Sequence, residues 1–277
     1  MEKANDPLFS VTDRIAVVTG AFGQIGTEFA KALHERGARV AVTSRRDMED
    51  AASRLGIEDD DGRLLAVRMD ITDQQSVERA LRQVVNTWGV PTVLVNNAGI
   101  DTQPSAPPEV SGPFERFPPE IFREVVETNL VGTFLVTQAA GRLMREAGVS
   151  GSIINVGSIY GMVSPVQDIY AYKAEDTGVP FVKPVAYSAA KSGVYNLTRY
   201  CATYWGREGI RVNTLTPAGV WRDTQDDKFH ANYEARIPIG RMAQADEYNG
   251  ALIFLASDAS RYMTGANLVV DGGWTAW

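Results

Sequence analysis

The sequence predicts an α/β domain in which a mostly parallel, doubly wound sheet of seven strands carries helices on both faces. Short β-branched apolar runs alternate with longer amphipathic stretches along the 277 residues, as in successive βα units. A glycine-rich turn directly follows the first apolar run. No low-complexity linker divides the chain, and its 44% hydrophobic content can fill one large core. We therefore expect residues 1–277 to form a single domain.

The first βα unit carries the glycine-rich turn. The apolar run Ile15–Val18 predicts a strand, and Thr19–Gly26 follows it with three glycines before an amphipathic helix that includes Phe29 and Leu33. A helix N-terminus behind such a turn presents backbone N–H groups and a positive dipole end, which suit a pyrophosphate. A plain βα turn with glycines for tight packing is the alternative.

A second strand, residues 39–43, closes the βαβ unit after a predicted C-cap at Gly37. Ser44, Arg45 and Arg46 come next, where a dinucleotide fold faces the adenosine ribose. A carboxylate at this point selects a free 2′-hydroxyl, whereas an arginine accommodates a 2′-phosphate. Ser44 with two arginines therefore predicts a preference for NADP over NAD.

The next two strands end in polar residues. Residues 65–69 form the third strand, which ends at Asp70 and Ile71, and residues 72–75 resemble a capping box before a helix that reaches Trp88. The fourth strand, residues 92–95, leads into Asn96-Asn97-Ala98-Gly99. A proline-rich stretch from residue 101 to 119 then predicts a surface loop.

A long helix from Glu120 to about Arg145 holds Asn129 near its middle, where an asparagine is neither cap nor turn. Asn129 is thus either an exposed polar residue or a buried functional one. A fifth strand, residues 153–156, precedes Ser158. The carboxyl end of a strand is where open α/β sheets bind their ligands, so Ser158 is a candidate site residue.

Tyr187 and Lys191 lie four residues apart at the start of a helix that runs to about Trp205. At this spacing the two side chains share a helix face, where an ammonium lowers the pKa of a phenol toward neutrality. A phenol of this kind can transfer protons at pH 7. Because such a pair also arises by chance, it is a weak signal without the other motifs.

The remaining chain supplies two strands and two segments beside the expected site. Residues 211–215 form the sixth strand, before Pro217-Ala218-Gly219, and residues 267–270 form the last strand after a helix over 246–255. Residues 161–184 form a long loop between Ser158 and Tyr187, rich in aromatic and charged residues. Residues 220–236 lack clean periodicity. We expect both segments to lie on the substrate side, the second as a mobile element.

Composition excludes several classes of function. The net charge of −7 and a pI near 5.0, without a Lys/Arg-rich face, indicate that the protein does not bind nucleic acid. We expect no leader in residues 1–13 and no membrane-spanning run. The single cysteine, Cys201, favours a packed thiol in a reducing cytoplasm. His34 and His230 lack partners at ligand spacing, so no metal site is expected.

Taken together, these motifs resemble the short-chain dehydrogenase/reductase family, in its single-domain branch, over nearly the whole chain. The resemblance implies a Rossmann-like fold and an NAD(P)-dependent enzyme that forms a homo-oligomer, a tetramer or dimer, partly through the two long helices. It places the catalytic set on Asn129, Ser158, Tyr187 and Lys191. The cofactor contacts it implies are Gly20, Gln24, Ile25, Gly26, Ser44, Arg45, Asp70, Ile71, Asn97, Ala98, Gly99, Tyr187, Lys191, Pro217, Gly219 and Val220.

The sequence departs from the family pattern at three places. Gln24 stands where the glycine loop usually has glycine, and Ala218 replaces the glycine of the Pro-Gly motif. The stretch between Ser158 and Tyr187 is about twice the usual length. The geometry of the loop and the register of the turn therefore stay open.

The expected reaction is hydride transfer between a nicotinamide and a carbonyl or secondary alcohol carbon, with Tyr187 exchanging the proton. The resemblance implies that Ser158 binds the substrate oxygen, that Lys191 holds the ribose, and that Asn129 anchors a water in a proton path. Aromatic and polar residues in 161–184, with a weaker resemblance to enzymes of bacterial surface-sugar pathways, favour a sugar or sugar derivative. The alternatives are a 3-oxoacyl thioester (acyl-carrier-protein) reductase and a non-catalytic dinucleotide-sensing regulator, although the intact catalytic set disfavours the regulator.

Overall fold

The computed structural model describes residues 6–46, 48–59, 62–102, 106–107, 110–178 and 180–277. All pairings between neighbouring strands are parallel, and the order in the sheet is β3-β2-β1-β4-β5-β6-β7. The predicted fold class is thus confirmed, and each predicted strand lies within two residues of the observed one. The strands are β1 (Ile15–Thr19), β2 (Arg39–Ser44), β3 (Leu64–Arg68), β4 (Val93–Asn96), β5 (Gly151–Val156), β6 (Ile210–Pro217) and β7 (Asn267–Val270).

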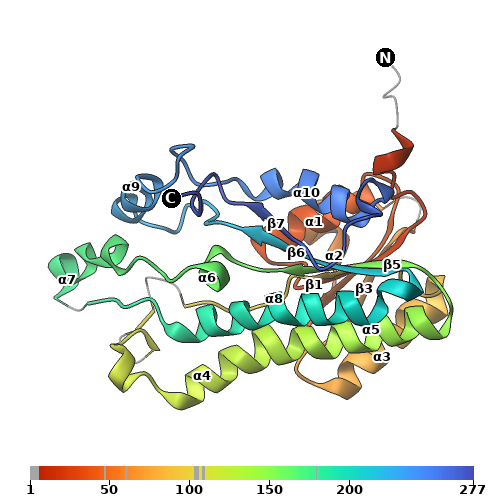
Figure 1. The fold of residues 1–277 in the computed structure, drawn as a ribbon, viewed down its shortest axis with the longest axis horizontal. Helices are drawn as coiled ribbons and strands as arrows, with labels where there is room; N and C mark the ends of the chain where they lie inside the picture. The colour runs from red at the N-terminus through yellow and green to blue at the C-terminus, as the bar shows by residue number, and fades with distance from the viewer. Residues whose placement is uncertain (1–5, 47, 60–61, 103–105, 108–109, 179) are drawn as a thin grey trace.

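Helices cover both faces of the sheet (Figure 1). On one face α1 (Gln24–His34) and α10 (Asn249–Ala256) bury Phe29, Leu33 and Leu252 against β1, β2 and β4. On the other, α3 (Gln74–Trp88), α5 (Gly132–Glu146) and α8 (Val185–Trp205) bury residues such as Leu81 and Met144. Burying both faces explains why the strands are continuous apolar runs rather than alternating ones.

The polarity of the sheet places the site. After β1 the chain adds β2 and β3 on one side of it, and then continues with β4 on its other side. This change of direction makes a topological switch point at the carboxyl ends of β1 and β4. Gly20, Ser44 and Asn97 stand at or beside the ends of β1, β2 and β4, and Ser158 follows β5. The motifs found separately in the sequence therefore meet at one edge of the sheet.

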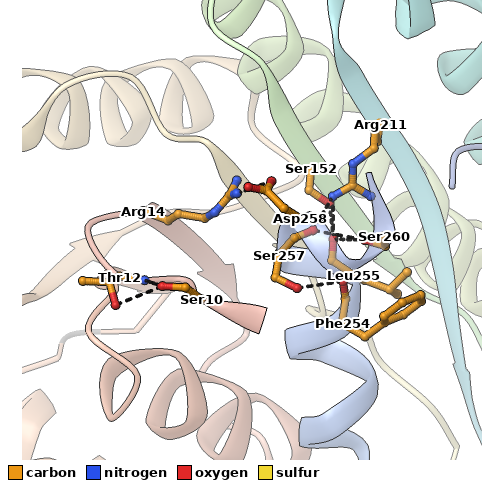
Figure 2. A network of polar contacts seen from close by, with 10 residues as sticks. All are labelled: Ser10, Thr12, Arg14, Ser152, Arg211, Phe254, Leu255, Ser257, Asp258 and Ser260. Carbon is orange, nitrogen blue, oxygen red and sulfur yellow. Dashed lines mark hydrogen bonds and ion pairs between the residues drawn. The ribbon is translucent and has the colours of Figure 1, made fainter. Parts of the chain in front are cut away.

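At the amino ends of β5 and β6 a polar network fastens α10 and the turn after it to the sheet (Figure 2). Ser152 Oγ donates to the carbonyl of Leu255 at 2.7 Å. Arg211 Nη2 donates to the carbonyls of Leu255 and Ser257 at 2.9 and 3.2 Å. Because these groups lie at the strand ends opposite Ser158, the network holds the scaffold and is no part of the site.

The segments 161–184 and 220–236 contain helices that periodicity did not predict. The first segment holds a 3-10 turn (Gln167–Tyr170) and α7 (Tyr172–Thr177), and the second holds α9 (Asp227–Glu234). A short helix, α6 (Ile159–Met162), precedes the first. Tyr170, Phe181 and Phe229 pack with Tyr233 and Trp274 in one buried aromatic cluster. These tertiary contacts stabilise helices too short to form alone, so the expectation of a loop over 161–184 was wrong.

One other local prediction needs correction. Asp73, not Thr72, caps α3, because its carboxylate accepts the N–H of Gln75 at 2.8 Å while the Thr72 hydroxyl donates to Asp70 at 2.7 Å. The predicted helix over 120–145 is present without a break, as α4 (Pro119–Val126), a π-helical turn (Glu127–Val131) and α5 in succession. A further α-helix of the described residues is α2 (Ala51–Leu55). Among the described residues, no helix has the length and apolar character needed to cross a membrane.

Candidate active site

A cleft of about 710 Å³ opens at the carboxyl ends of the strands and extends from the glycine loop to the aromatic cluster. It brings together all the predicted cofactor contacts and the side chains of Ser158, Tyr187 and Lys191. Asn129 alone of the predicted site residues does not line it. The cofactor contacts along the cleft are Gly20, Gln24, Ile25, Gly26, Ser44, Arg45, Asp70, Ile71, Asn97, Ala98, Gly99, Tyr187, Lys191, Pro217, Gly219 and Val220.

The glycine loop leaves room for a large anion in front of α1. Gly20 has φ +63°, and a Cβ on Gly26 would lie 2.3 Å from the carbonyl oxygen of Gly20. The Asn97 amide donates to the carbonyls of Thr19 and Gly20 at 3.1 and 3.0 Å, which fixes the loop to the end of β4. Since Gly26 lies in the first turn of α1, N–H groups without helical partners face the cleft, as pyrophosphate binding requires. The residues present therefore fit a dinucleotide.

Gln24, the departure from the family loop, links the cofactor side of the cleft to the segment 220–236. Its Nε2 donates to the carbonyl of Trp221 at 2.6 Å, and its Oε1 accepts from Arg222 Nε at 2.8 Å. Gly23 is the N-cap of α1 in extended conformation, so the loop keeps its turn without a glycine at 24. Arg222 lines the cleft as well, and sequence reasoning had not singled it out.

Arginines gather where the adenosine end of a dinucleotide would lie. Arg45, Arg46 and Arg54 all line this part of the cleft. Hydrogen bonds from Thr72 hold the pKa of the nearby Asp70 below its usual range, against the effect of partial burial, and the charge of Arg45 adds to the lowering. Arg54 stacks on Phe22 with its guanidinium carbon 4.4 Å from the ring centroid. Because Arg54 comes from α2, the sequence offered no signal for its place here.

Tyr187 and Lys191 share a face of α8, with Lys191 Nζ 5.8 Å from the centroid of the Tyr187 ring. The Lys191 ammonium donates to the carbonyl of Val156 at 2.6 Å. Burial lowers the pKa of Lys191 to about 8, partly offset by the charge of Asp101. The side chain therefore stays mostly protonated at neutral pH.

The prediction of a lowered phenol pKa was wrong for this structure. Burial raises the pKa of Tyr187 well above its usual value, the Asp101 carboxylate raises it further, and hydrogen bonding by Ser158 only partly opposes them. Two effects oppose each other: loss of hydration disfavours the phenolate, and the Lys191 ammonium would stabilise it. The first effect is the larger, because the ammonium is directed to a carbonyl. Tyr187 is accordingly a neutral phenol at pH 7.

Ser158 follows β5 and begins α6, where its Oγ accepts the N–H of Tyr160 at 3.2 Å. The Tyr195 hydroxyl fixes the backbone of Ser158: it donates to the Ser158 carbonyl at 2.8 Å, and the Ser158 N–H approaches it at 3.3 Å. Tyr195 lies two turns along α8 from Tyr187 and was not predicted. The spacing of eight residues from Tyr187 was the available signal, since it places both rings on one face.

Asn129 is completely buried within the π-helical turn, which excludes the exposed alternative. Its amide exchanges two hydrogen bonds with the backbone of Ile100: Oδ1 accepts from N–H and Nδ2 donates to the carbonyl, both at 2.8 Å. A Cβ on Gly99 would lie 3.1 Å from Asn129 Oδ1 and 3.9 Å from Lys191 Nζ. Asn129 thus reaches the site through the segment after β4 that carries Gly99, next to Lys191.

The substrate side of the cleft is aromatic and also holds an ion pair with a buried lysine. Tyr160, Tyr170, Phe229 and Tyr233 line it together with Lys183 and Asp101. The Tyr233 hydroxyl accepts the N–H of Gly219 at 2.9 Å, and a Cβ on Gly219 would lie 2.6 Å from the Tyr233 ring. Gly219 is therefore needed for close packing in the turn after β6, where the family glycine is replaced by Ala218.

The histidines and the cysteine behave as packing residues. His34 is buried with its Nε2 3.2 Å from Asp59 Oδ1, and His230 stacks on Trp221 with centroids 5.6 Å apart. Burial raises the pKa of Cys201 to about 11, which leaves an unreactive thiol. The described part of the chain contains no group of three or more His, Cys, Asp or Glu side chains that could hold a metal ion.

Comparisons with known proteins agree with this geometry. A family model described as Enoyl-(Acyl carrier protein) reductase matches residues 20–275. Cis-4-hydroxycyclohexanecarboxylate dehydrogenase of Sinomonas cyclohexanicum is 39% identical over 95% of this chain and 97% of its own length. L-rhamnose 1-dehydrogenase (NAD(P)(+)) of Azotobacter vinelandii is 33% identical over 94% of this chain and 96% of its own length.

A solved structure shares the same fold. The gluconate 5-dehydrogenase from Burkholderia cenocepacia J2315, in complex with NADP and tartrate, has a TM-score of 0.83 and 30% identity, covering 98% of each chain. With the glycine loop, the Ser158, Tyr187 and Lys191 arrangement and the parallel sheet in place, the chain belongs to the short-chain dehydrogenase/reductase family, as an NAD(P)-dependent oxidoreductase that acts on CH–OH or C=O groups.

Proposed function

We propose that the protein interconverts a secondary hydroxyl and a ketone on a small polyhydroxylated substrate, a sugar or sugar derivative. The observation that carries this proposal is the lining of the substrate side of the cleft. Tyrosines, a lysine and a carboxylate line it next to a cluster of aromatic side chains that packs against Tyr187. Aromatic faces pack against the C–H faces of a sugar ring, while the polar groups bind its hydroxyls. The rhamnose and gluconate dehydrogenases among the relatives support this substrate class.

In the proposed mechanism Tyr187 exchanges a proton with the substrate oxygen, and the Ser158 hydroxyl binds that oxygen. The neutral phenol that burial favours is the form that donates a proton to a carbonyl. A bound nicotinamide supplies the hydride acceptor or donor, and its oxidised form carries a positive charge that favours the phenolate. Lys191, with its charge retained at neutral pH, holds the nicotinamide ribose.

Asn129 has a supporting role in this proposal. Its side-chain amide makes one donated and one accepted hydrogen bond with the backbone of Ile100, and its backbone carbonyl accepts the Thr133 hydroxyl at 2.9 Å. We expect Asn129 to fix the segment after β4 that carries Gly99 beside Lys191, and the π-helical turn to give Asn129 this position. A water between Asn129 and Lys191, which the family resemblance implies, stays a proposal.

For the cofactor, we infer a preference for NADP over NAD. Three arginines line the part of the cleft next to Ser44, and a guanidinium binds a 2′-phosphate through a fork of donors. Residue 47, the only carboxylate in the adjoining turn before Met48, lies outside the described residues.

We further propose that residues 161–184 and 220–236 act as one substrate-side lid on a single domain, and that the protein is a homo-oligomer of the cytoplasm. Exposed Phe134 on α5 and exposed Tyr200 and Tyr204 on α8 support an association through these helices. The free, buried Cys201 suits a reducing compartment. Light scattering on a sizing column measures the oligomer directly, and a monomer would contradict it.

The test of the function is a substrate screen read by absorbance of the reduced nicotinamide. Sugars, polyols, simple alcohols and 3-oxoacyl thioesters are each offered with NADP(H) and with NAD(H). We expect polyhydroxylated substrates to give the highest kcat/KM. The thioester alternative predicts instead that an acyl thioester exceeds every sugar, and the regulator alternative predicts cofactor binding without turnover of any of them.

A further inference from the structure

Lys183 and Asp101 form an ion pair in the substrate side of the cleft, in which the lysine is buried and the carboxylate is partly exposed. Lys183 Nζ lies 2.6 Å from Asp101 Oδ2 and donates to the carbonyl of Thr102 at 2.8 Å. The Lys183 side chain is only 6% exposed and that of Asp101 is 29% exposed. Lysines are rarely this buried, and pairing makes burial tolerable without requiring it at this place. The position of the pair therefore calls for a functional explanation.

The backbone around Lys183 is rigidly held. The Lys183 N–H donates to Gln167 Oε1 at 2.9 Å, and Gln167 Nε2 donates to the Lys183 carbonyl at 3.1 Å. This reciprocal pair of hydrogen bonds ties Lys183 to the 3-10 turn of the 161–184 segment. Asp101 directly follows Ile100, whose backbone Asn129 holds in the segment after β4. Both charges are thus fixed from two sides of the cleft, as a specificity element must be.

The pair adjoins the reacting position. Lys183 Nζ lies 5.6 Å from the centroid of the Tyr187 ring, and both members of the pair line the cleft with Ser158 and Tyr187. The charge of Asp101 also contributes to the raised pKa of Tyr187, after burial. A substrate whose oxygen meets the Tyr187 hydroxyl would therefore bring its neighbouring atoms into the part of the cleft that the pair lines.

The pair has unused hydrogen-bonding capacity. Among the described residues, the Lys183 ammonium donates to two acceptors, which leaves one of its three protons. Asp101 Oδ1 accepts from the Thr102 N–H at 2.8 Å and Oδ2 from Lys183, so each oxygen retains a lone pair. An adjacent donor and acceptor with no net charge match a neutral hydroxyl, which both donates and accepts. An entering carboxylate would be repelled by Asp101 as it is attracted by Lys183.

We propose that the Lys183–Asp101 pair recognises a hydroxyl on the carbon next to the reacting carbon, and that the substrate is therefore a neutral vicinal diol. The proposal rests on the proposed function and narrows its substrate class. It makes Lys183 and Asp101 specificity-determining residues, which orient the substrate while Tyr187 and Ser158 act on its oxygen.

The test compares three probes that share a six-membered ring: cis-cyclohexane-1,2-diol, cyclohexanol and 4-hydroxycyclohexanecarboxylate. The readout is the ratio of kcat/KM for diol to that for cyclohexanol. We expect the wild-type enzyme to favour the diol by about 10- to 100-fold, as for a hydrogen bond to a charged group. The ratio should fall toward one in Lys183→Met, and Lys183→Arg should retain part of it.

Lys183→Met leaves the Asp101 carboxylate without its ion-pair partner. The double variant Lys183→Met/Asp101→Asn avoids this effect, because it removes both charges at once. Thermal melts check that each variant folds, and cofactor titration by fluorescence should give dissociation constants near the wild-type value. If Lys183→Met fails to fold, the double variant decides by the same ratio, which we expect to be close to one.

Four results would overturn the proposal. If the folded variants lost kcat/KM equally for the diol and for cyclohexanol, the pair would only position Tyr187. A wild-type preference for the hydroxy acid over the diol would assign the pair to carboxylate binding. If the wild-type enzyme turned over no alcohol with either cofactor, the proposed function would fall too, whereas turnover without discrimination between the probes would overturn this proposal alone.

Discussion

Asp226 joins the two substrate-side segments, and its removal should open them. Its carboxylate accepts the Tyr172 hydroxyl at 2.7 Å and pairs with Lys173 at 2.9 Å, both from the 161–184 segment. It also caps α9 by accepting the Phe229 N–H at 2.8 Å. In Figure 1, α7 and α9 lie together at one end of the molecule, beyond the sheet. One side chain therefore makes two connections between the segments of the proposed lid and one within α9.

The magnitude follows from these contacts. Loss of a helix cap costs about 1 kcal/mol, and loss of the Tyr172 hydrogen bond costs about 1 kcal/mol. Loss of the ion pair with Lys173 adds only about a few tenths of a kcal/mol, because the Asp226 side chain is 41% exposed and water screens the charges. Asp226→Ala should therefore lower the free energy of opening the lid by about 2 kcal/mol, which corresponds to about 30-fold faster amide exchange.

The assay is hydrogen exchange followed by mass spectrometry of peptides from both segments. Lys228→Met is the matched control, because Lys228 forms an ion pair with Asp176 across the same two segments and both side chains are exposed to the screening effect of water. We expect faster exchange and a raised KM in Asp226→Ala, with global stability little changed. Unchanged protection of both segments in Asp226→Ala would refute the reasoning.

The contribution of Asp226 also depends on pH. Partial burial raises the pKa of this carboxyl, but hydrogen bonds from Lys173, Tyr172 and the Phe229 N–H outweigh it and leave the pKa lowered. Because the closed lid holds the proton less tightly than the open one, the stabilisation is complete above the ordinary pKa of about 4 and is lost as pH falls through the lowered value. The exchange difference between wild type and Asp226→Ala should therefore shrink in acid.

Two further predictions concern packing and the cofactor. A Cβ on Gly141 would lie 2.3 Å from the buried Trp205 ring. Although alanine has the better helix propensity, Gly141→Ala should therefore lower the free energy of unfolding, measured in urea, by about 1 to 2 kcal/mol. Gly250→Ala, with nothing within 4 Å, is the control and should stabilise slightly; equal effects would contradict the packing argument. Arg45→Ala should lower the NADP-to-NAD ratio of kcat/KM about tenfold or more, and an unchanged ratio would remove Arg45 from 2′-phosphate binding.

The sheet could be predicted from sequence because burial on both faces leaves a direct mark. Strands buried on both sides must be short apolar runs, and each ends where a polar or glycine residue begins the site. The residues that were found, such as Ser158 and Asn97, stand at those ends. For this reason, the assembly of the cleft followed from the element order and the parallel topology alone.

What the sequence could not predict depends on contacts between distant segments. The helices within 161–184 and 220–236 are stabilised by an aromatic cluster whose members lie up to about a hundred residues apart. Lys183 pairs with Asp101 across 82 residues, and Tyr195 acts on Ser158 across 37. The raised pKa of Tyr187 is likewise a consequence of depth in the fold, which the spacing of Tyr187 and Lys191 does not reveal.

The central claim is that the Tyr187 hydroxyl transfers the proton in an otherwise intact cofactor site. It is tested most directly by measuring kcat and the cofactor dissociation constant together in Tyr187→Phe. The account predicts a fall in kcat of about 100- to 10,000-fold, the usual contribution of general acid–base catalysis, with the dissociation constant close to the wild-type value. A phenylalanine variant that kept a substantial fraction of kcat would contradict it.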